Sequence, residues 1–397
     1  MMKSCAFFGC ETISSPASIE FLAWLTATFC VYWLSPLVLR RYLLIISTAG
    51  ILAYADPKSL LTLSAMTTVV CIATRTKGAW HAASLLGACA AVLGALLTFK
   101  FLETVVATPS MLDRVVPLGL SFYSLRCVHL LLERYLDQID RPGVLQVIEY
   151  LFFPPTIIAG PIHRYPTFVA EKPTAFEFPK FSEGLERILY GYVKIIVLSN
   201  YLLGARFFPW AMSGVEPSTA GYQYLDSLSY GLTIYLQFSG YSDIAIGFAL
   251  LFGHRVMENF SWPLLQPNIV AFWRSWHISL TGLCREYVFT SVYASTRQAW
   301  IGVFATMLAV SLWHGLTLNY LAWGLYHATG LVIFQQWSKS TAAAYLRGVL
   351  PLPINRFLGW FLTFQFVILG FVLTKESDIA ASIDVYVILI SGAFGGV

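Results

Sequence analysis

The sequence predicts an all-α integral membrane protein that crosses the bilayer many times. Hydrophobic residues make up 57% of the 397 residues and charged residues only 12%, about half the ~25% typical of soluble domains. Apolar runs long enough to cross a bilayer recur along the chain. Lysine and arginine gather in alternate connections between these runs. So few charges exclude a water-soluble fold, and the same composition excludes disordered, collagen-like and coiled-coil classes.

The apolar runs predict the positions of the spans. A span needs ~20 apolar residues, with ~17 as a practical minimum, and six runs meet this length: 21–39, 79–99, 115–132, 188–208, 224–253 and 357–373. Five shorter runs lie at 42–55, 59–73, 299–313, 318–334 and 379–394. We therefore expect about 11 transmembrane helices. The run 144–160 contains Pro154, Pro155 and Gly160, which predicts a re-entrant or broken segment buried in protein rather than a plain span.

The basic residues orient these spans. With the N-terminus outside, the basic connections fall in the cytoplasm, as the positive-inside rule requires; they hold Arg40 and Arg41, Arg75 and Lys77, Arg134 and Arg141, and the segments 161–187, 254–298 and 339–356. Between Arg206 and Arg255 there is no Lys or Arg, so the connection 209–223 is expected outside. The exceptions are Lys58, Arg114 and Lys375. We expect a multi-pass membrane protein with its N-terminus outside.

The net charge and the cysteine spacing argue against a nucleic-acid-binding surface and against disulfide or metal sites. The net charge of +4 is explained by the cytoplasmic connections, and no Lys/Arg-rich tract predicts a nucleic-acid partner. The seven cysteines show neither a CxxC motif nor paired spacing. We therefore expect no disulfide framework and no metal site.

One candidate for the chemistry is His314, in the motif Leu312–Leu316. It lies inside the almost wholly apolar stretch 299–334, which is long enough for two short spans and is broken after His314 by Gly315. Ionisable groups at membrane depth are costly and hence candidates for function. An imidazole at such a break can act as a general acid or base. The alternative is a structural histidine that binds a carbonyl freed at the break.

A second candidate is the segment 272–280, which the orientation places on the cytoplasmic side. It contains Trp273, Arg274, Trp276, His277 and Ser279. Trp273 and His277 are four residues apart and would share a face if the segment is helical. Aromatic rings, a guanidinium and an imidazole would suit a thioester donor with a phosphate-bearing arm. The alternative is a belt of tryptophans and arginine at the membrane interface.

A third candidate is the segment 237–243, with Tyr241 and Asp243 close to an apolar run. Asp243 could pair with a basic group such as Arg274 or cap the N-terminus of a half-helix, and we favour a structural role. His163 is interpreted as a loop residue after the broken segment. The remaining histidines, His81, His129, His254 and His327, are interpreted as interface or packing residues.

These motifs together resemble the membrane-bound O-acyltransferase (MBOAT) family, in its bacterial branch of alginate O-acetyltransferase-like proteins. The matching pieces are FFPPTIIAGPIHRY (152–165), QFSGYSDIAIGFALLFG (237–253), ENFSWPLLQPNIVAFWRSWHISL (258–280) and SLWHGLTLNYLAWGLYH (311–327). The resemblance implies a single MBOAT domain over 1–397, with its acyl-transfer core at about 115–335 around a central tunnel. It also implies that His314 matches the catalytic histidine of the family and His277 its second functional histidine.

The resemblance implies transfer of an acyl group, foremost acetyl, from a cytoplasmic thioester donor to an extracytoplasmic acceptor. Acetyl-CoA is the expected donor, no cofactor is expected to stay bound, and Trp313 and Asn319 join the residues above as candidates for donor binding. An SGNH-type partner outside the membrane would then esterify a polysaccharide. Cys284 and the segment Glu133–Tyr135 depart from the pattern of the family, which leaves the acceptor open. Alternatives are a D-alanyl transferase that uses a carrier-protein thioester, and a non-enzymatic exporter or scaffold.

Overall fold

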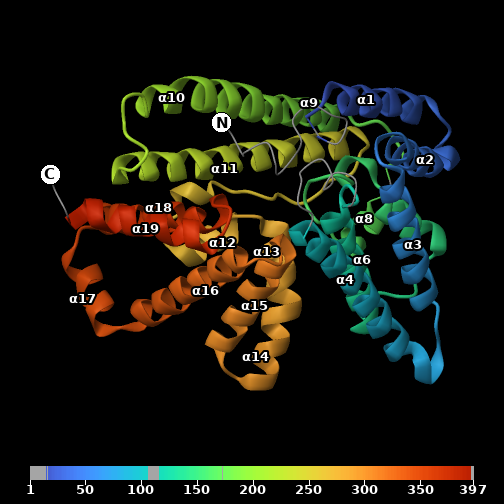
Figure 1. The fold of residues 1–397 in the computed structure, drawn as a ribbon. Coiled ribbons are helices and arrows are strands. Elements are labelled where there is room, and N and C mark those ends of the chain that lie inside the picture. Colours follow the sequence, from blue (N-terminus) through green and yellow to red (C-terminus); the bar gives the residue numbers. More distant parts are fainter. Residues whose placement is uncertain (1–14, 16, 106–115, 172, 395–397) are drawn as a thin grey trace. The chain divides into compact units, whose positions relative to one another are not determined.

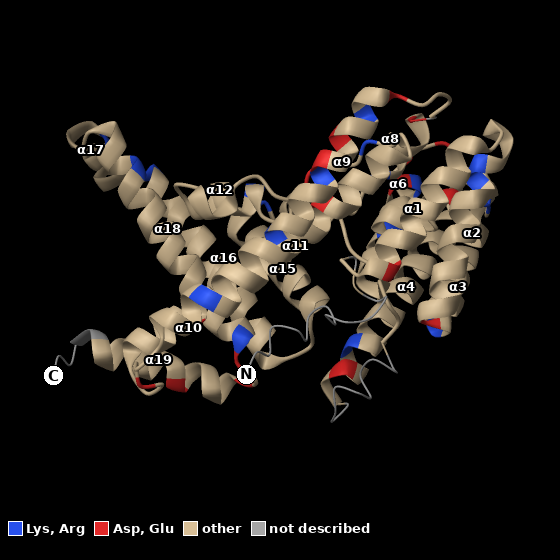
Figure 2. Cartoon of the chain, turned by 90° about the horizontal axis from the view of Figure 1, so that it is seen from above, with Lys and Arg blue, Asp and Glu red and all other residues tan. Residues whose placement is uncertain are grey.

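The computed structural model describes residue 15 and residues 17–105, 116–171 and 173–394, and every regular element in these ranges is a helix (Figure 1). The prediction of an all-α protein is therefore confirmed. Arg114, one of the exceptions to the charge pattern, lies outside the described residues, as do Cys5 and Cys10. Charged residues are sparse on the helices, apart from α9 (Phe178–Tyr192), which carries several of both signs (Figure 2).

The chain divides into two compact units, residues 1–195 with 238–258 and residues 196–237 with 259–397. Two long helical segments contribute residues to both units. One continues from α9 into the π-helical turns η4 (Val193–Phe207), and the other is α11 (Ala220–Leu251). Each unit is described by itself.

The first unit consists of helices that begin at typical capping residues. Ser18 accepts a hydrogen bond from Phe21 N–H at 3.1 Å, and Pro57 occupies the first turn of the third helix, where its missing N–H is tolerated. Its elements are α1 (Ile19–Leu34), α2 (Leu37–Ala55), α3 (Pro57–Ala73), η2 (Gly78–Trp80), α4 (His81–Val105), α6 (Leu120–Tyr135), α7 (Val144–Leu151), η3 (Pro154–Thr156), α8 (Tyr165–Ala170) and α9.

The run 144–160 is broken and buried in the first unit, as predicted from its prolines. Helix α7 ends at Leu151, one 3₁₀ turn follows at Pro154, and the chain to Arg164 has no regular structure. Residues 150–163 are all buried. His163 lies in this irregular stretch, as interpreted from the sequence, and its carbonyl accepts a hydrogen bond from the Tyr150 hydroxyl at 2.8 Å.

Four glycines bring α9 and α11 into close contact within the first unit. Gly184 and Gly191 lie on α9, and Gly240 and Gly247 lie on α11 with the same spacing of seven. A Cβ at Gly191 would come within 2.6 Å of the Gly240 carbonyl oxygen, and a Cβ at Gly247 within 2.6 Å of the Gly184 carbonyl oxygen. The two backbones therefore touch, an arrangement that small residues permit between membrane helices.

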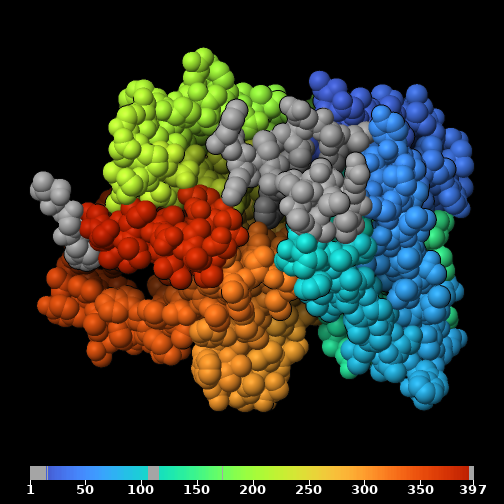
Figure 3. Space-filling view, viewed as in Figure 1, coloured from blue at the N-terminus to red at the C-terminus, as the bar shows by residue number. Residues whose placement is uncertain are grey.

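The second unit contains the two helix interruptions that matter for function. Its elements, besides η4 and α11, are α10 (Phe208–Ala211), η5 (Pro263–Leu265), α12 (Ile269–Ser275), α13 (Ile278–Cys284), η6 (Arg285–Phe289), α14 (Thr290–Thr296), α15 (Ala299–His314), α16 (Leu318–Lys339), α17 (Thr341–Val349), α18 (Leu352–Lys375) and α19 (Ile379–Phe394). Helices α15 and α16 pack as a hairpin, and α16 also contacts α17, α18 and α19. In Figure 3 the C-terminal helix α19 (red) borders the orange surface to which α16 belongs.

Five helices among the described residues are long and apolar enough to cross a membrane: 37–55, 78–105, 178–211, 220–251 and 352–375. Shorter apolar helices lie at 19–34, 57–73, 299–314 and 379–392. Nine of the eleven predicted runs overlap one of these helices, whereas the runs 115–132 and 318–334 fall on α6 and α16, which are not among them. The count of eleven spans stays a prediction.

Candidate functional site

The candidate site lies in the second unit, where two interruptions of the helices carry His277 and His314. Helix α12 packs against α16, and α13 packs against α15. The two interruptions are thereby brought to the same aromatic cluster. Sequence separation between the histidines is large, so only the tertiary fold can produce this meeting.

The first interruption separates α12 from α13. Helix α12 ends at Ser275, and His277 has a left-handed backbone with φ 45° and ψ 53°. Such a conformation is unfavourable for a residue with a Cβ and often marks a functional position. Trp273 and His277 would share a face only if the segment were one helix, and the helix ends between them. Trp273 instead packs against Trp323, with 5.7 Å between ring centroids.

Asn259 fixes the ring of His277. The Oδ1 atom of Asn259 accepts hydrogen bonds from the Ser279 hydroxyl at 2.9 Å and from the Ser279 N–H at 3.4 Å. Because a backbone N–H can only donate, the oxygen of the amide faces this side. His277 Nδ1 lies 3.1 Å from the same oxygen and must therefore carry the proton. The lone pair of the neutral imidazole is then on Nε2.

Burial keeps His277 neutral. The side chain is 1% exposed, and the loss of solvation lowers its pKa well below the ordinary 6.5. The positive charge of a protonated His314 lowers the pKa of His277 further. His277 is therefore neutral at neutral pH and can accept a hydrogen bond at Nε2.

The second interruption separates α15 from α16. Helix α15 ends at His314, and Thr317 caps α16 by accepting a hydrogen bond from Tyr320 N–H at 3.3 Å. Gly315 is required here, because a Cβ would come within 2.7 Å of the Tyr320 ring. The Ser311 hydroxyl donates to the Tyr320 carbonyl and links the two sides of the break. The break predicted from Gly315 is confirmed.

Trp313 lies between the two histidines. Its ring centroid is 5.5 Å from that of His277 and 4.7 Å from that of His314, with edge-to-face geometry in both cases. His314 stacks on Tyr320 at 5.6 Å and meets the edge of Trp323 at 5.4 Å. His314 is half-buried, whereas His277 is fully buried. The two imidazoles thus belong to one aromatic cluster, and His314 is the more accessible of the two.

The other residues predicted for segment 272–280 have separate environments. Arg274 is exposed. Trp276 is 7% exposed and packs against Phe260, with 5.2 Å between centroids. Ser279 is fully buried in its bond to Asn259.

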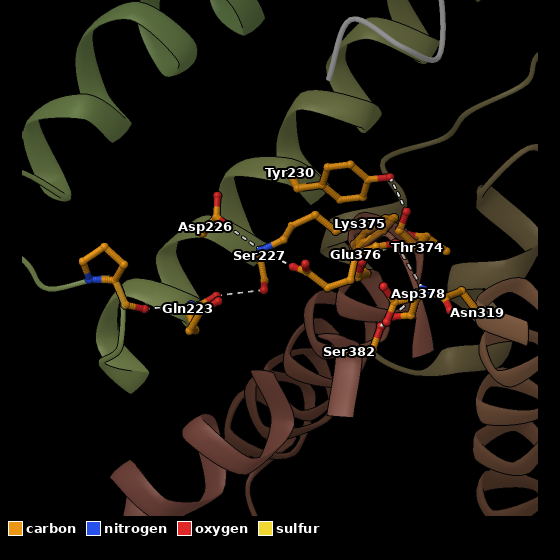
Figure 4. A network of polar contacts seen from close by, with 12 residues as sticks. Gln223, Asp226, Ser227, Tyr230, Asn319, Thr374, Lys375, Glu376, Asp378 and Ser382 are labelled. Atoms are coloured by element: carbon orange, nitrogen blue, oxygen red, sulfur yellow. Dashed lines mark hydrogen bonds and ion pairs between the residues drawn. The ribbon is translucent and has the colours of Figure 1, made fainter. Parts of the chain in front are cut away.

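Asn319, predicted for donor binding, is part of a structural network. Its Nδ2 atom donates to the Glu376 carbonyl at 3.1 Å and faces Ser382 Oγ at 3.4 Å. Figure 4 shows this network continuing through Lys375, which binds both Glu376 and Asp226. The first turn of α16, just after the His314 break, is therefore tied to the α18–α19 junction.

Tyr241 and Asp243 belong to the first unit. Both are buried in α11. Asp243 lies in the interior of this helix, so the prediction that it caps a half-helix is wrong. Arg187 binds its Oδ1 at 2.7 Å and Lys194 binds its Oδ2, in place of the expected pairing with Arg274. The structural role favoured for Asp243 fits these contacts.

Sequence reasoning missed one residue of this site, Asn259. Asn259 lies 18 residues before His277, in a loop, and only its place in the segment ENFSWP gave a signal. His327, interpreted as a packing residue, packs within this aromatic cluster: its ring lies 5.2 Å from Trp273 and 5.0 Å from Trp323. Within the described ranges, no group of three or more His, Cys, Asp or Glu side chains is arranged to hold a metal ion.

Comparison with known proteins identifies the family. The sequence model of MBOAT, the membrane-bound O-acyltransferase family, matches residues 20–373. The chain belongs to this family. As an MBOAT protein with several long apolar helices, it is a membrane protein.

Several MBOAT relatives are similar over most of this chain. The probable alginate O-acetylase AlgI of Pseudomonas aeruginosa is 32% identical over 279 residues, 68% of this chain and 51% of the relative. The teichoic acid D-alanyltransferase of Bacillus subtilis is 28% identical over 64% of this chain and 67% of the relative. The peptidoglycan O-acetyltransferase of Helicobacter pylori is 26% identical over 69% of this chain and 56% of the relative. The chain thus spans about half the length of the alginate O-acetylases that it matches.

Proposed function

We propose that this MBOAT protein transfers an acyl group, foremost acetyl, from a thioester donor to a hydroxyl acceptor. The observation that carries the proposal is the meeting of His277 and His314 at two helix interruptions around Trp313. The names of the similar alginate and peptidoglycan O-acetyltransferases support acetyl as the group and a polysaccharide as the final acceptor.

The geometry suggests separate roles for the histidines. His314, half-buried, is the base that takes the proton of the acceptor hydroxyl as its oxygen attacks the thioester carbonyl. The imidazolium then returns the proton to the leaving thiolate, so no net charge is created. A positioned histidine contributes roughly 10²–10⁴ in rate through such proton transfer. In a second version of the step, the acyl group rests transiently on His314.

His277 orients the donor in this proposal. Its neutral ring, held by Asn259, presents Nε2 as an acceptor. The amide N–H groups of a pantetheine arm are donors of the kind that this atom would bind. His277 would thus fix the arm while Trp313 separates it from the base.

The membrane orientation follows from the charge pattern of the connections. With the N-terminus outside in a bacterial plasma membrane, the donor reaches His277 from the cytoplasm and the acceptor reaches His314 from the other side. The immediate acceptor would be an extracytoplasmic SGNH-type partner that then esterifies the polysaccharide. No cofactor needs to stay bound, because acetyl-CoA is a substrate in this scheme.

The test is a donor assay with purified protein in detergent. Wild type and His314→Ala are incubated with radiolabelled acetyl-CoA, with and without a candidate SGNH partner. We expect release or transfer of label by wild type and a loss of roughly 10²–10⁴ in rate for His314→Ala. Turnover by His314→Ala at the wild-type rate would contradict the assignment.

A second candidate is D-alanyl transfer from a carrier protein, which the similarity to teichoic acid D-alanyltransferases favours. The chemistry at His314 would be the same, and only the donor would differ. Turnover of a D-alanyl carrier-protein thioester, with none of acetyl-CoA, would select this candidate.

A further inference from the structure

The loop between Asn259 and Asn268 presents a tryptophan to the outside of the second unit. Trp262 is 71% exposed, and its backbone is left-handed with φ 50° and ψ 51°. The loop is held in place: Gln266 Nε2 donates to the Trp262 carbonyl at 3.2 Å, and Trp360 Nε1 donates to the Leu264 carbonyl at 2.9 Å. The indole of Trp262 is thus exposed on a loop whose backbone is fixed by hydrogen bonds.

An unneutralised guanidinium lies beside this loop. The Ser261 N–H donates to the Ser275 carbonyl at 3.0 Å. Trp262 follows Ser261 in the chain and Arg274 precedes Ser275, so this bond brings their backbones close together. Arg274 is exposed and forms no hydrogen bond or ion pair among the residues that the structure describes. No Asp or Glu occurs from Asn259 to Arg285. The loop and α12 therefore combine an exposed aromatic ring with positive charge, and this segment of the chain supplies no counter-charge.

The same loop leads directly to the candidate site. Ile278 N–H donates to the Asn259 carbonyl at 2.9 Å, and the Asn259 side chain holds His277. Trp262 is three residues from Asn259 and Arg274 is three residues from His277. A ligand on Trp262 and Arg274 would therefore lie close to the histidine that receives the donor.

We propose that Trp262 and Arg274 bind the adenine nucleotide of a coenzyme A thioester. The base would stack on the indole, an interaction open to any base because each has a π face, and the phosphates would accept hydrogen bonds from the guanidinium. A carrier-protein phosphopantetheine lacks this nucleotide, so the surface selects coenzyme A over a carrier protein. This inference rests on the proposed function.

The test compares two donors that differ only in the nucleotide, acetyl-CoA and S-acetylpantetheine. Trp262→Ala should lower the ratio of their kcat/KM values about tenfold, as expected for the loss of one base–aromatic stack, and Trp262→Phe should restore most of it. Arg274→Gln should lower the ratio in the same direction. Trp80→Ala is the matched control, because Trp80 is 76% exposed and lies at the start of the predicted span 79–99, next to the basic connection with Arg75 and Lys77 predicted on the same side. It should leave the ratio unchanged.

Binding of unacylated coenzyme A and of pantetheine to the same variants separates this inference from the proposed function. Binding that weakens about tenfold in Trp262→Ala for coenzyme A alone supports the nucleotide surface even if no turnover occurs, in which case only the proposed function fails. Equal losses for both molecules in Trp262→Ala would overturn the inference and indicate that the ring is a membrane-interface anchor. An unchanged ratio and unchanged binding would overturn it as well.

Discussion

His277 depends on a side chain far from it in the sequence. Asn259 Oδ1 accepts from Ser279 and from His277 Nδ1, which fixes both the orientation and the tautomer of the ring. Without this oxygen, the proton can move to Nε2 and the ring can rotate. We therefore expect Asn259→Ala to lower kcat about tenfold, the cost of losing one hydrogen bond, with little change in the amount of folded protein.

Asn259→Asp distinguishes positioning from mere packing. The carboxylate keeps an acceptor at the same place and adds a negative charge, which favours the protonated form of His277 and raises its pKa. At alkaline pH, the activity of Asn259→Asp should return toward that of wild type. As the pH is lowered, its activity should begin to fall at a higher pH than that of wild type. A pH–rate profile identical to that of wild type would show that Asn259 acts on folding alone.

At this scale the sequence predicted the two histidines but not their surroundings. Family motifs contain His277 and His314, and Gly315 marked the break that follows His314. The left-handed backbone at His277 carries no Gly or Pro signal, so the sequence did not predict the interruption there. Asn259 could not be assigned, because its role exists only once the loop folds back onto Ser275 and Ile278.

At the scale of elements, four glycines hold the backbones of α9 and α11 in close contact within the first unit. Gly191→Ala would place a methyl group within 2.6 Å of a backbone oxygen that cannot move without its helix. We expect this substitution to lower the free energy of unfolding by about 1–3 kcal/mol. Thermal unfolding in detergent, followed by circular dichroism, is the measurement.

Gly94→Ala is the control for this prediction. Gly94 is in the interior of α4, and a Cβ there would meet no atom within 4 Å. The change should keep or slightly raise stability, because alanine favours a helix more than glycine does. If Gly191→Ala and Gly94→Ala behave alike, the close approach of α9 and α11 is not a stabilising feature.

Helix positions were largely predictable because hydropathy is local. The runs 224–253 and 357–373 fall within or almost within α11 and α18, and prolines predicted the break of 144–160. Interruptions such as α12–α13 were not predictable, because they are stabilised by contacts with distant segments. Lys194, within the predicted span 188–208, was also missed as the partner of Asp243.

At the scale of the whole molecule, buried neutral histidines make stability depend on pH. Burial, with a smaller effect of Lys180, lowers the pKa of His254 from 6.5 to about 4. The unfolded chain therefore takes up this proton at higher pH than the folded protein does. The contribution of His254 to the free energy of unfolding is fully present above pH 6.5 and is lost as the pH falls toward 4. Below that pH there is no further loss, and the total contribution is about 3 kcal/mol.

This prediction is tested by unfolding measurements between pH 7.5 and pH 4. His254→Gln should make the loss of stability on acidification smaller than in wild type, whatever its effect at pH 7.5. An equal slope in wild type and His254→Gln would contradict the prediction.

The division into two units was not evident from the sequence, which presented one continuous series of apolar runs. Composition establishes the membrane environment, and loop charge predicts an orientation. Neither predicts that α11 contributes residues to both units. The single MBOAT domain over 1–397 stays a prediction.

The central claim is that His277 and His314 act together in acyl transfer. The most direct measurement is the single-turnover rate of acetyl release from acetyl-CoA in His277→Ala, His314→Ala and the double variant. Residues that act as a unit give non-additive losses, so we expect each single variant to lose roughly 10² or more and the double variant to be no slower than the slower single one. Additive losses, or His314→Ala within threefold of wild type, would contradict the account.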